Sequence, residues 1–230
     1  MRRNERHTML RLADAWTWDF WLADDGRAYH LYFLKAPRHI GHPGVFADRG
    51  GDGWHMLLTA RACDGTADQR GVIGHARSYD LVHWQAQPPL SRPGGGFGHL
   101  EVPQVEVVAG RPVLVFSCLG AGLSDEHRKA GMPGGIWCLP CESPLGPFTP
   151  DRAVRMTSES LYSGRLVRDR AEQWVMLAFR NHGPDGRFIG ELSDPMPVGW
   201  AADGSTLKLD TALPTTDATP GRPEREGSTP

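Results

Sequence analysis

The sequence lacks the features that would assign it to a membrane or nucleic-acid-binding class. Its 230 residues contain no apolar run near the roughly 20 residues that a bilayer-spanning helix requires. The formal net charge is −2 and no block of Lys and Arg is present, so no nucleic-acid partner is expected. The basic N-terminus has no apolar core and is unlike a secretory signal, whether Met1 or Met9 is the start. We therefore expect a cytoplasmic protein without a membrane partner.

Cysteine is also scarce, and its pattern argues against a metal site. Cys138 and Cys141 have CxxC spacing, but no second pair or Cys/His cluster completes a zinc site. The pair lies in a strand-like run, where residues three apart point to opposite faces. We expect free, mostly buried thiols, no metal and no cofactor. Histidines in strand contexts are interpreted as hydrogen-bonding groups: His30, His55, His75, His83 and His99.

Helical periodicity is almost absent, and only Ser124–Ala130 is typical of a helix. The chain instead contains 28 glycines, 19 prolines and 8 tryptophans, with many short alternating apolar runs. This composition is typical of an all-β domain with many short strands and turns.

Four segments resemble one another, each with a turn followed by an alternating apolar run. They are GRAYHLYFLKA from Gly26, GDGWHMLLTAR from Gly51, AGRPVLVFSCL from Ala109 and AEQWVMLAFRN from Ala171. Each of these segments is preceded by another strand-like piece. A third strand follows in the last three units, and a fourth strand follows in at least two of them. A repeated four-stranded unit predicts a β-propeller.

The spacing of these units indicates that the first is cut short. Their starts lie about 25, 58 and 62 residues apart, against roughly 40–60 for a propeller blade. We predict an incomplete five-bladed-type propeller of about three and a half blades and about 14 strands, over residues 13–210. Residues 1–12 form an N-terminal extension, and the polar segment 211–230 is a disordered tail. The missing half-blade predicts an exposed apolar face and self-association through it.

One carboxylate, Asp19, lies among aromatic residues in the run WTWDFW. Aromatic residues suit a half-buried strand, whereas a buried carboxylate needs a partner or a cleft where its charge is used. Taken alone, Asp19 is better explained as a residue that caps a turn or satisfies backbone N–H groups at a strand end. Flat rings around a carboxylate also suit a sugar, whose C–H faces stack on aromatic side chains.

The order of the motifs resembles the family 32 glycoside hydrolases, which are β-fructofuranosidase-like five-bladed propellers. WTWDFW followed by YHLYFLKAP resembles the opening of that family, and GHARSYDLVHW resembles its recurrent blade ending. LEVPQV, at residues 100–105, resembles the family's E-C-P-D-L-F motif, and the following GRPVLVFSC also fits. The resemblance covers roughly residues 10–210.

The resemblance implies a retaining glycosidase with Asp19 as nucleophile and Glu101 as general acid/base. Such chemistry needs two carboxyl groups about 5–5.5 Å apart. Glu159, at the start of the last inner strand, is a rival acid/base. Four side chains are expected to bind the carbohydrate: Trp18, Trp21, His42 and Tyr162.

Departures from the family leave two alternatives open. His42 stands where the family has a third carboxylate, and an imidazole cannot replace an anionic clamp opposite an oxocarbenium-like charge. The outer strands of the first blade and the next blade are missing, and Trp18 replaces an Asn. The chain could instead be a catalytically silent carbohydrate-binding remnant, or a related arabinosidase or xylosidase.

Overall fold

The computed structural model describes residues 17–24, 29–35, 44–48, 51, 53–183 and 185–209. Up to residue 45 it describes the backbone alone. The predicted N-terminal extension, the tail 211–230 and His42 lie outside the described residues.

The described chain is almost entirely β-structure, as its composition predicts. It forms fifteen strands, one short α-helix (α1, Asp125–Lys129) and two short 3-10 turns (Gly120–Gly122 and Pro150–Arg152). The strands are β1 Thr17–Asp24, β2 Tyr29–Lys35, β3 Gly44–Ala47, β4 Trp54–Arg61, β5 Gly71–Ser78, β6 Gln85–Gln87, β7 Glu101–Val108, β8 Arg111–Cys118, β9 Gly135–Pro140, β10 Val154–Arg155, β11 Leu161–Arg168, β12 Trp174–His182, β13 Phe188–Leu192, β14 Met196–Trp200 and β15 Leu207–Leu209.

These strands form four antiparallel sheets in chain order, which we call blades I to IV. Blade I is β1-β2, blade II is β3-β4-β5-β6 and blade III is β7-β8-β9-β10. Blade IV is β11-β12-β14-β15, with β13 also paired to β12. The first strand of each blade is its inner strand. Three full blades and one half-blade therefore confirm the repeat that the sequence predicts.

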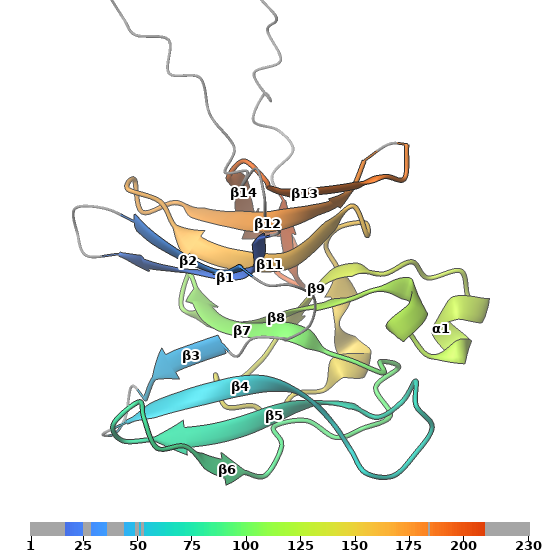
Figure 1. Cartoon of the computed structure of the whole chain (residues 1–230), viewed down its shortest axis with the longest axis horizontal. Helices are drawn as coiled ribbons and strands as arrows, with labels where there is room; N and C mark the ends of the chain where they lie inside the picture. Colours follow the sequence, from blue (N-terminus) through green and yellow to red (C-terminus); the bar gives the residue numbers. More distant parts are fainter. Residues whose placement is uncertain are drawn as a thin grey trace, which may run out of the picture.

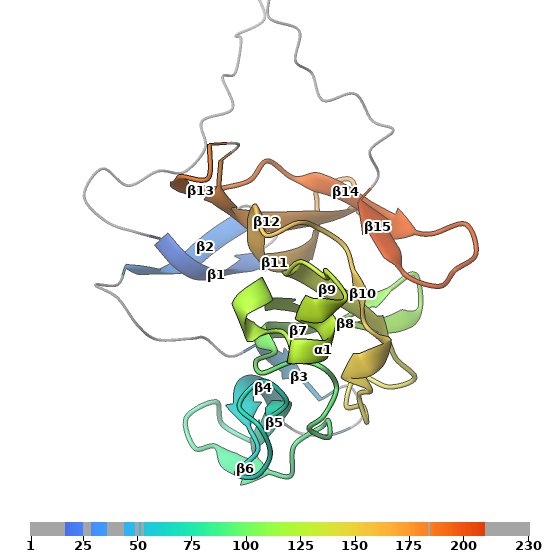
Figure 2. The same ribbon diagram turned by 90° about the vertical axis from the view of Figure 1, so that its right-hand side faces the viewer.

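The blades stack as neighbours around an incomplete ring (Figures 1 and 2). Strands β3 and β4 of blade II contact β7, and β11 of blade IV contacts β7, β8 and β9. The half-blade contacts the last blade, since β1 lies beside β11. The fold is thus an incomplete β-propeller, and its inner strands all start toward one end of the molecule (Figure 1).

The core consists of two layers, one on each face of blade III. Leu114 and Phe116 of β8 pack toward blade II, with Leu57 and Ile73. The alternate residues of β8, such as Val113, pack toward blade IV. Because both faces are buried, β8 and β9 read as continuous apolar runs rather than as alternating strands.

The third strand of blade IV is the main departure from the predicted strand count. It is split into β13 and β14, which pair with different parts of β12, and the break falls at the predicted Asp194–Pro195 turn. The chain therefore has fifteen described strands rather than about fourteen. The predicted helix is confirmed, and the Ser124 side chain accepts a hydrogen bond from the backbone N–H of His127 to cap it.

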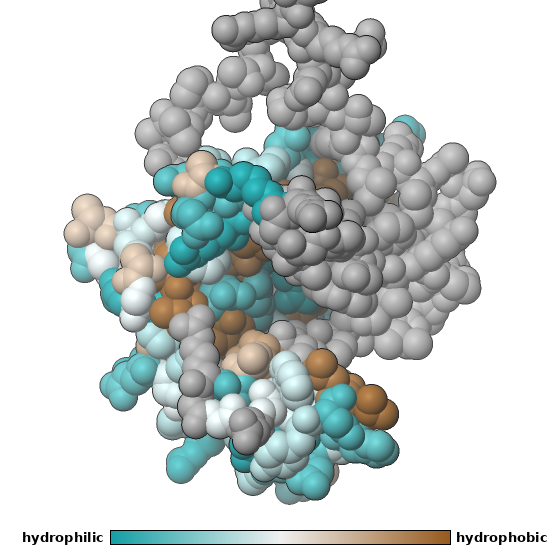
Figure 3. Space-filling view, turned by 90° about the vertical axis from the view of Figure 1, so that its left-hand side faces the viewer, coloured by the Kyte–Doolittle hydropathy of each residue, from teal (hydrophilic) through white to brown (hydrophobic). Residues whose placement is uncertain are grey.

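The four thiols are free, as expected, and only Cys63 is exposed. Cys138 and Cys141 lie in different core layers, which confirms that the CxxC pair points to opposite faces. No helix within the described ranges is long and apolar enough to cross a membrane. Seen from the end where the inner strands finish, hydrophobic side chains lie exposed between polar ones (Figure 3).

Candidate functional site

A β-bulge recurs near the start of three inner strands. The register of β1 shifts between Trp18 and Phe20, so Asp19 lies within the bulge. In β7 the shift lies between Glu101 and Gln104, and in β11 between Tyr162 and Arg165. Each bulge adds one residue to the inner strand. Bulges re-aim side chains and are common beside active sites.

The backbone at two of these bulges is strained. Val102 follows Glu101 with φ 52°, and Ser163 follows Tyr162 with φ 51°. Side-chain-bearing residues rarely adopt this left-handed conformation, and such residues cluster at functional sites. The two strained residues therefore mark the same place in neighbouring blades.

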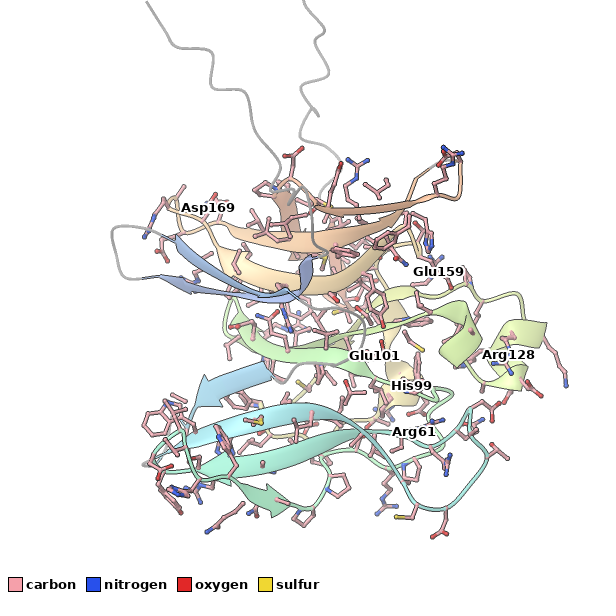
Figure 4. All side chains as sticks on the ribbon, in the orientation of Figure 1. Arg61, His99, Glu101, Arg128, Glu159 and Asp169 are labelled. Atoms are coloured by element: carbon pink, nitrogen blue, oxygen red, sulfur yellow. The ribbon has the colours of Figure 1, made fainter. Side chains whose placement is uncertain are left out.

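Glu101 and Tyr162 meet at this place, from adjacent inner strands. The Tyr162 hydroxyl donates a hydrogen bond to Oε2 of Glu101. Tyr162 is buried and packs with Val102 and Phe179, whereas Glu101 is partly exposed. Figure 4 shows Glu101 between blades, at the end where the inner strands begin. A phenol that holds one carboxyl oxygen fixes the orientation of the other.

His99 lies beside Glu101, and Arg61 of blade II lies beyond His99 (Figure 4). The Nδ1 atom of His99 is 3.9 Å from Oε1 of Glu101. Burial lowers the pKa of His99 below its usual value, and the nearby positive charge of Arg61 lowers it further. His99 is therefore uncharged at neutral pH and adds no cation that would favour the ionised carboxylate.

Hydrogen bonds from both neighbouring blades hold the backbone around Glu101. The Thr59 hydroxyl of blade II donates to the carbonyl of Leu100 at 3.2 Å and accepts from the N–H of Val102 at 3.3 Å. From blade IV, buried Arg165 donates through Nη1 to the carbonyl of Val102 at 3.0 Å. Glu101 thus sits between two residues whose backbone is anchored, which preorganises its carboxylate.

Cys118 lies behind the site on β8 and is not equipped as a nucleophile. Burial raises the pKa of its thiol to about 12, and the negative charges of Glu101 and Glu159 also raise it. Since the thiolate is the reactive form, this thiol is inert at physiological pH.

Glu159 has a structural environment. Its Oε1 accepts hydrogen bonds from the backbone N–H groups of Gly120 and Gly134, the latter at 2.9 Å. A Cβ at Gly134 would come within 2.4 Å of that oxygen. Gly120 and Gly134 lie at the two ends of the segment that contains α1. Glu159 therefore connects both ends of this segment to the start of β11.

The structure brings two of the six predicted site residues together in side-chain detail, Glu101 and Tyr162. It places Asp19, Trp18 and Trp21 in β1 beside β11, with the backbone alone described. His42 lies outside the described residues. Among the residues described here, no three His, Cys, Asp or Glu side chains are grouped to hold a metal ion.

Two features of the site were not predicted, the bulges and the neighbourhood of His99. Pro103 was the available signal for the bulge in β7, because proline inside a strand is confined to edges and bulges. The sequence indicates for His99 only a hydrogen-bonding role within a blade. Its position two residues before Glu101 does not predict a lowered pKa, because the charge that acts on it, Arg61, belongs to another blade.

Comparisons with known proteins concern the fold. The sequence matches no protein-family profile and no curated protein. The structure resembles the inulosucrase of Halalkalicoccus jeotgali bound to kestose, with TM-score 0.57 and 18% identity over 80% of this chain and 58% of that one.

Two other solved structures give similar results. The sucrose-6-phosphate hydrolase of Lactobacillus gasseri has TM-score 0.54 and 16% identity, over 79% of this chain and 40% of that one. The GH32 β-fructofuranosidase of Bombyx mori has TM-score 0.53 and 12% identity, over 82% and 46%. At these identities the likeness shows a fold shared with fructosyl-acting glycoside hydrolases and transferases. The chain spans 40% to 58% of these three proteins.

Proposed function

We propose that the chain is a retaining glycosidase of the β-fructofuranosidase kind, a shortened relative of family 32. The observation that carries the proposal is the bulge shared by three inner strands, which groups Glu101 and Tyr162 and recurs at Asp19. Asp19 is the nucleophile and Glu101 the general acid/base. The substrate is a fructoside or a related sugar, with no metal or cofactor.

The surroundings of Glu101 support the role of general acid. Retaining hydrolysis needs one carboxyl group that gives a proton to the leaving oxygen while a second attacks the anomeric carbon. Tyr162 donates to Oε2 of Glu101 and so fixes the direction in which Oε1, the oxygen that we assign to proton delivery, is presented. Uncharged His99 beside Oε1 does not oppose protonation. After the glycosyl–enzyme forms, the same carboxylate takes the proton from the attacking water.

Hydrolysis of a panel of aryl fructosides, arabinosides and xylosides tests the proposal. We expect release from the fructosides, and a loss of about a thousandfold or more in Asp19→Ala and Glu101→Ala. Glu101→Gln should slow the hydrolysis of glycosides with poor leaving groups more than that of glycosides with good ones, because a good leaving group needs less proton transfer. Turnover that survives both alanine changes would refute the assignment. Preferred release from arabinosides or xylosides would instead support a related five-bladed glycosidase.

A catalytically silent carbohydrate-binding protein is the second candidate. His42 in the place of a third carboxylate supports it. Under this reading kestose binds beside Glu101 and Tyr162 without being cleaved. Calorimetry with Tyr162→Phe as a matched variant separates the two: binding with no product from any glycoside in the panel selects the silent reading.

The half-blade also supports self-association, which we propose together with a cytoplasmic location. Within the described strands β2 pairs only with β1, so its other edge can receive a further strand. A second copy is the partner that this edge would meet most often. Sedimentation across a hundredfold range of concentration checks this, and a monomer throughout would contradict it.

A further inference from the structure

His99 stands beside Glu101 with hydrogen-bonding capacity that the protein does not use. Its Nδ1 lies 3.9 Å from Oε1 of Glu101, and each of the two side chains is 38% exposed. Within the ranges that the structure describes, neither ring nitrogen of His99 makes a hydrogen bond to a protein group. The imidazole is therefore accessible from solvent and open to contact with a substrate.

The backbone around His99 is anchored on both sides, which fixes the position of the ring. The N–H of Gly98 donates to the carbonyl of Gly122 at 2.7 Å, and the carbonyl of Leu100 accepts from the Thr59 hydroxyl at 3.2 Å. A Cβ at Gly122 would lie 3.5 Å from Cδ2 of His99, so the ring packs against this backbone. A side chain held in this way can bind a substrate group at a small cost in conformational freedom.

His99 and Tyr162 lie on opposite sides of Glu101. Tyr162 belongs to blade IV, and β1, the strand that carries Asp19, contacts β11 of the same blade. Figure 4 shows His99 on the blade II side of Glu101, with Arg61 beyond it. Glu101 is thus flanked by the strand of the proposed nucleophile on one side and by His99 on the other.

This arrangement places the leaving group toward blade II. In a retaining hydrolysis the nucleophile attacks the anomeric carbon from the face opposite the leaving group. With Asp19 on the blade IV side, the leaving group extends toward His99 and Arg61. Arg61 is exposed and donates through Nη2 to the carbonyl of Ala67, and it forms no ion pair with any carboxylate in the described part of the chain. Both side chains offer hydrogen bonds, which suits a leaving group that carries hydroxyls.

The spacing of Nδ1 and Oε1 indicates which hydroxyl is bound. The glycosidic oxygen has to lie within about 2.6–3.2 Å of the oxygen that protonates it. An oxygen on the adjacent carbon of the leaving group lies next to it, and Nδ1, 3.9 Å from Oε1, can reach that second oxygen with a hydrogen bond of ordinary length. Burial and the charge of Arg61 lower the pKa of His99, so the neutral ring can donate with one nitrogen and accept with the other.

We propose that His99 is a specificity-determining residue, which binds a hydroxyl on the carbon next to the glycosidic oxygen and so favours a sugar or polyol as leaving group. Simple alkyl and aryl leaving groups lack this hydroxyl and lose the contact. The inference rests on the proposed function, because that function places the glycosidic oxygen at Oε1 of Glu101.

The 2-hydroxyethyl and propyl β-fructofuranosides are a matched pair of substrates, since they have the same number of non-hydrogen atoms and differ only in a terminal hydroxyl or methyl group. The ratio of their kcat/KM values should be at least about fivefold larger in the parent protein than in His99→Phe, which keeps a flat ring and removes both nitrogens. The ratio that remains in His99→Phe reports the difference in leaving-group acidity. An equal ratio in the two proteins would overturn the proposal.

Two further variants separate recognition from a structural effect. The amide of His99→Asn occupies about the position of Nδ1 and should restore most of the parent ratio. His83→Phe makes the same change at an exposed histidine after β5, at the far end of that strand from Arg61, and should leave the ratio unchanged. A loss of the ratio in His83→Phe, or none of it regained in His99→Asn, would contradict a direct contact through Nδ1.

NMR distinguishes a failure of this inference from a failure of the proposed function. In histidine-labelled Asp19→Ala, where turnover is removed, the 2-hydroxyethyl fructoside should shift the ring signals of His99 more than the propyl fructoside does. If this difference appears while the parent protein cleaves neither glycoside, the hydrolase proposal fails and the contact with His99 stands. If the parent cleaves both and the His99 signals respond equally or not at all, the inference fails and the hydrolase stands. Absence of both cleavage and any shift would overturn the two together.

Discussion

The Tyr162 hydroxyl donates to Glu101 across the boundary between two blades, so the carboxylate is oriented by a strand more than fifty residues away. This contact depends on two bulges at once, because the registers of β7 and β11 both shift there. Orientation of Glu101 is therefore a property of the packed blades and not of either strand alone.

Replacement of Tyr162 by Phe tests that orientation. The buried ring and its packing stay, while the hydrogen bond to Glu101 is lost. We expect kcat/KM for an aryl fructoside to fall about tenfold, which corresponds to ~1–2 kcal/mol for one hydrogen bond to a carboxyl group. Thermal unfolding of the variant provides the control. An unchanged kcat/KM in a folded protein would show that Tyr162 does not act on the acid/base.

Glu159 and Glu101 should respond differently to the same conservative change. In Glu159→Gln the amide oxygen can still accept from Gly120 and Gly134, so turnover should stay within about threefold of the parent protein. Glu159→Ala should lower the free energy of unfolding by roughly 1–3 kcal/mol, because two backbone donors lose their acceptor. Urea unfolding and aryl fructoside hydrolysis measure the two effects. A Glu159→Gln variant as inactive as Glu101→Gln would restore Glu159 as the acid/base.

The four cysteines should separate by reactivity. Burial raises the pKa of Cys118 to about 12 and that of Cys141 to about 11, and it also raises the pKa of Cys138. With iodoacetamide at pH 7.5, we expect one modified residue in the folded protein, the exposed Cys63. Peptide mass spectrometry locates the adduct, and Cys63→Ser should abolish it. Rapid labelling of Cys118 would contradict the burial of this part of blade III.

Stability should decline between pH 7.5 and pH 5. The folded pKa values of His75 and His99 lie below the unperturbed value of 6.5. As the pH falls through 6.5, the unfolded chain therefore binds protons first, and the unfolded state is favoured until the folded pKa values are passed. Urea midpoints at several pH values measure the decline. In a His75→Asn/His99→Asn double variant, the urea midpoint should depend less on pH over this range. An equally steep dependence would mean that other groups bind the protons.

The turn between β7 and β8 offers a stabilising change. Ala109 and Gly110 form a two-residue hairpin loop with φ 50° and 79°, the conformation that favours Asn-Gly. We expect Ala109→Asn to raise the free energy of unfolding by about 0.5–1 kcal/mol, whereas Gly110→Ala should lower it by about 1 kcal/mol. Thermal unfolding of the two variants checks this: the melting temperature should rise in Ala109→Asn and fall in Gly110→Ala.

The repeat was predictable because alternating runs and turns are local signals. The blade sequence, the half-blade and the helix after Ser124 all follow from such signals. The buried runs of β8 and β9 could be identified as strands, but their double burial depends on having a blade on each face. Val102 illustrates the limit, since EVPQVEVV reads as a regular strand and a β-branched residue is a poor candidate for positive φ.

The strands that carry Glu101 and Tyr162 were predictable, but the contact between the two side chains was not. Glu101 and Tyr162 were both placed on inner strands, yet only packing shows that the phenol reaches the carboxylate. A cavity lined by residues 46–48, 55, 105–107 and 143–145 had no sequence signal, because these four stretches meet only through the way blades II and III stack.

The left-handed backbone at Val102 and Ser163 provides an evolutionary reading of the site. Each costs of order 1–3 kcal/mol, and glycine at either position would relieve that strain. At Ser163, which belongs to none of the apolar clusters, a lineage released from selection on the site should therefore accumulate glycine, whereas glycine at Val102 would also lose the packing against Tyr162 and Phe179. A lineage that still depends on the site should retain side chains at both positions. Natural variants of this chain thus carry a record of whether its ancestors kept using the carboxylate that these bulges position.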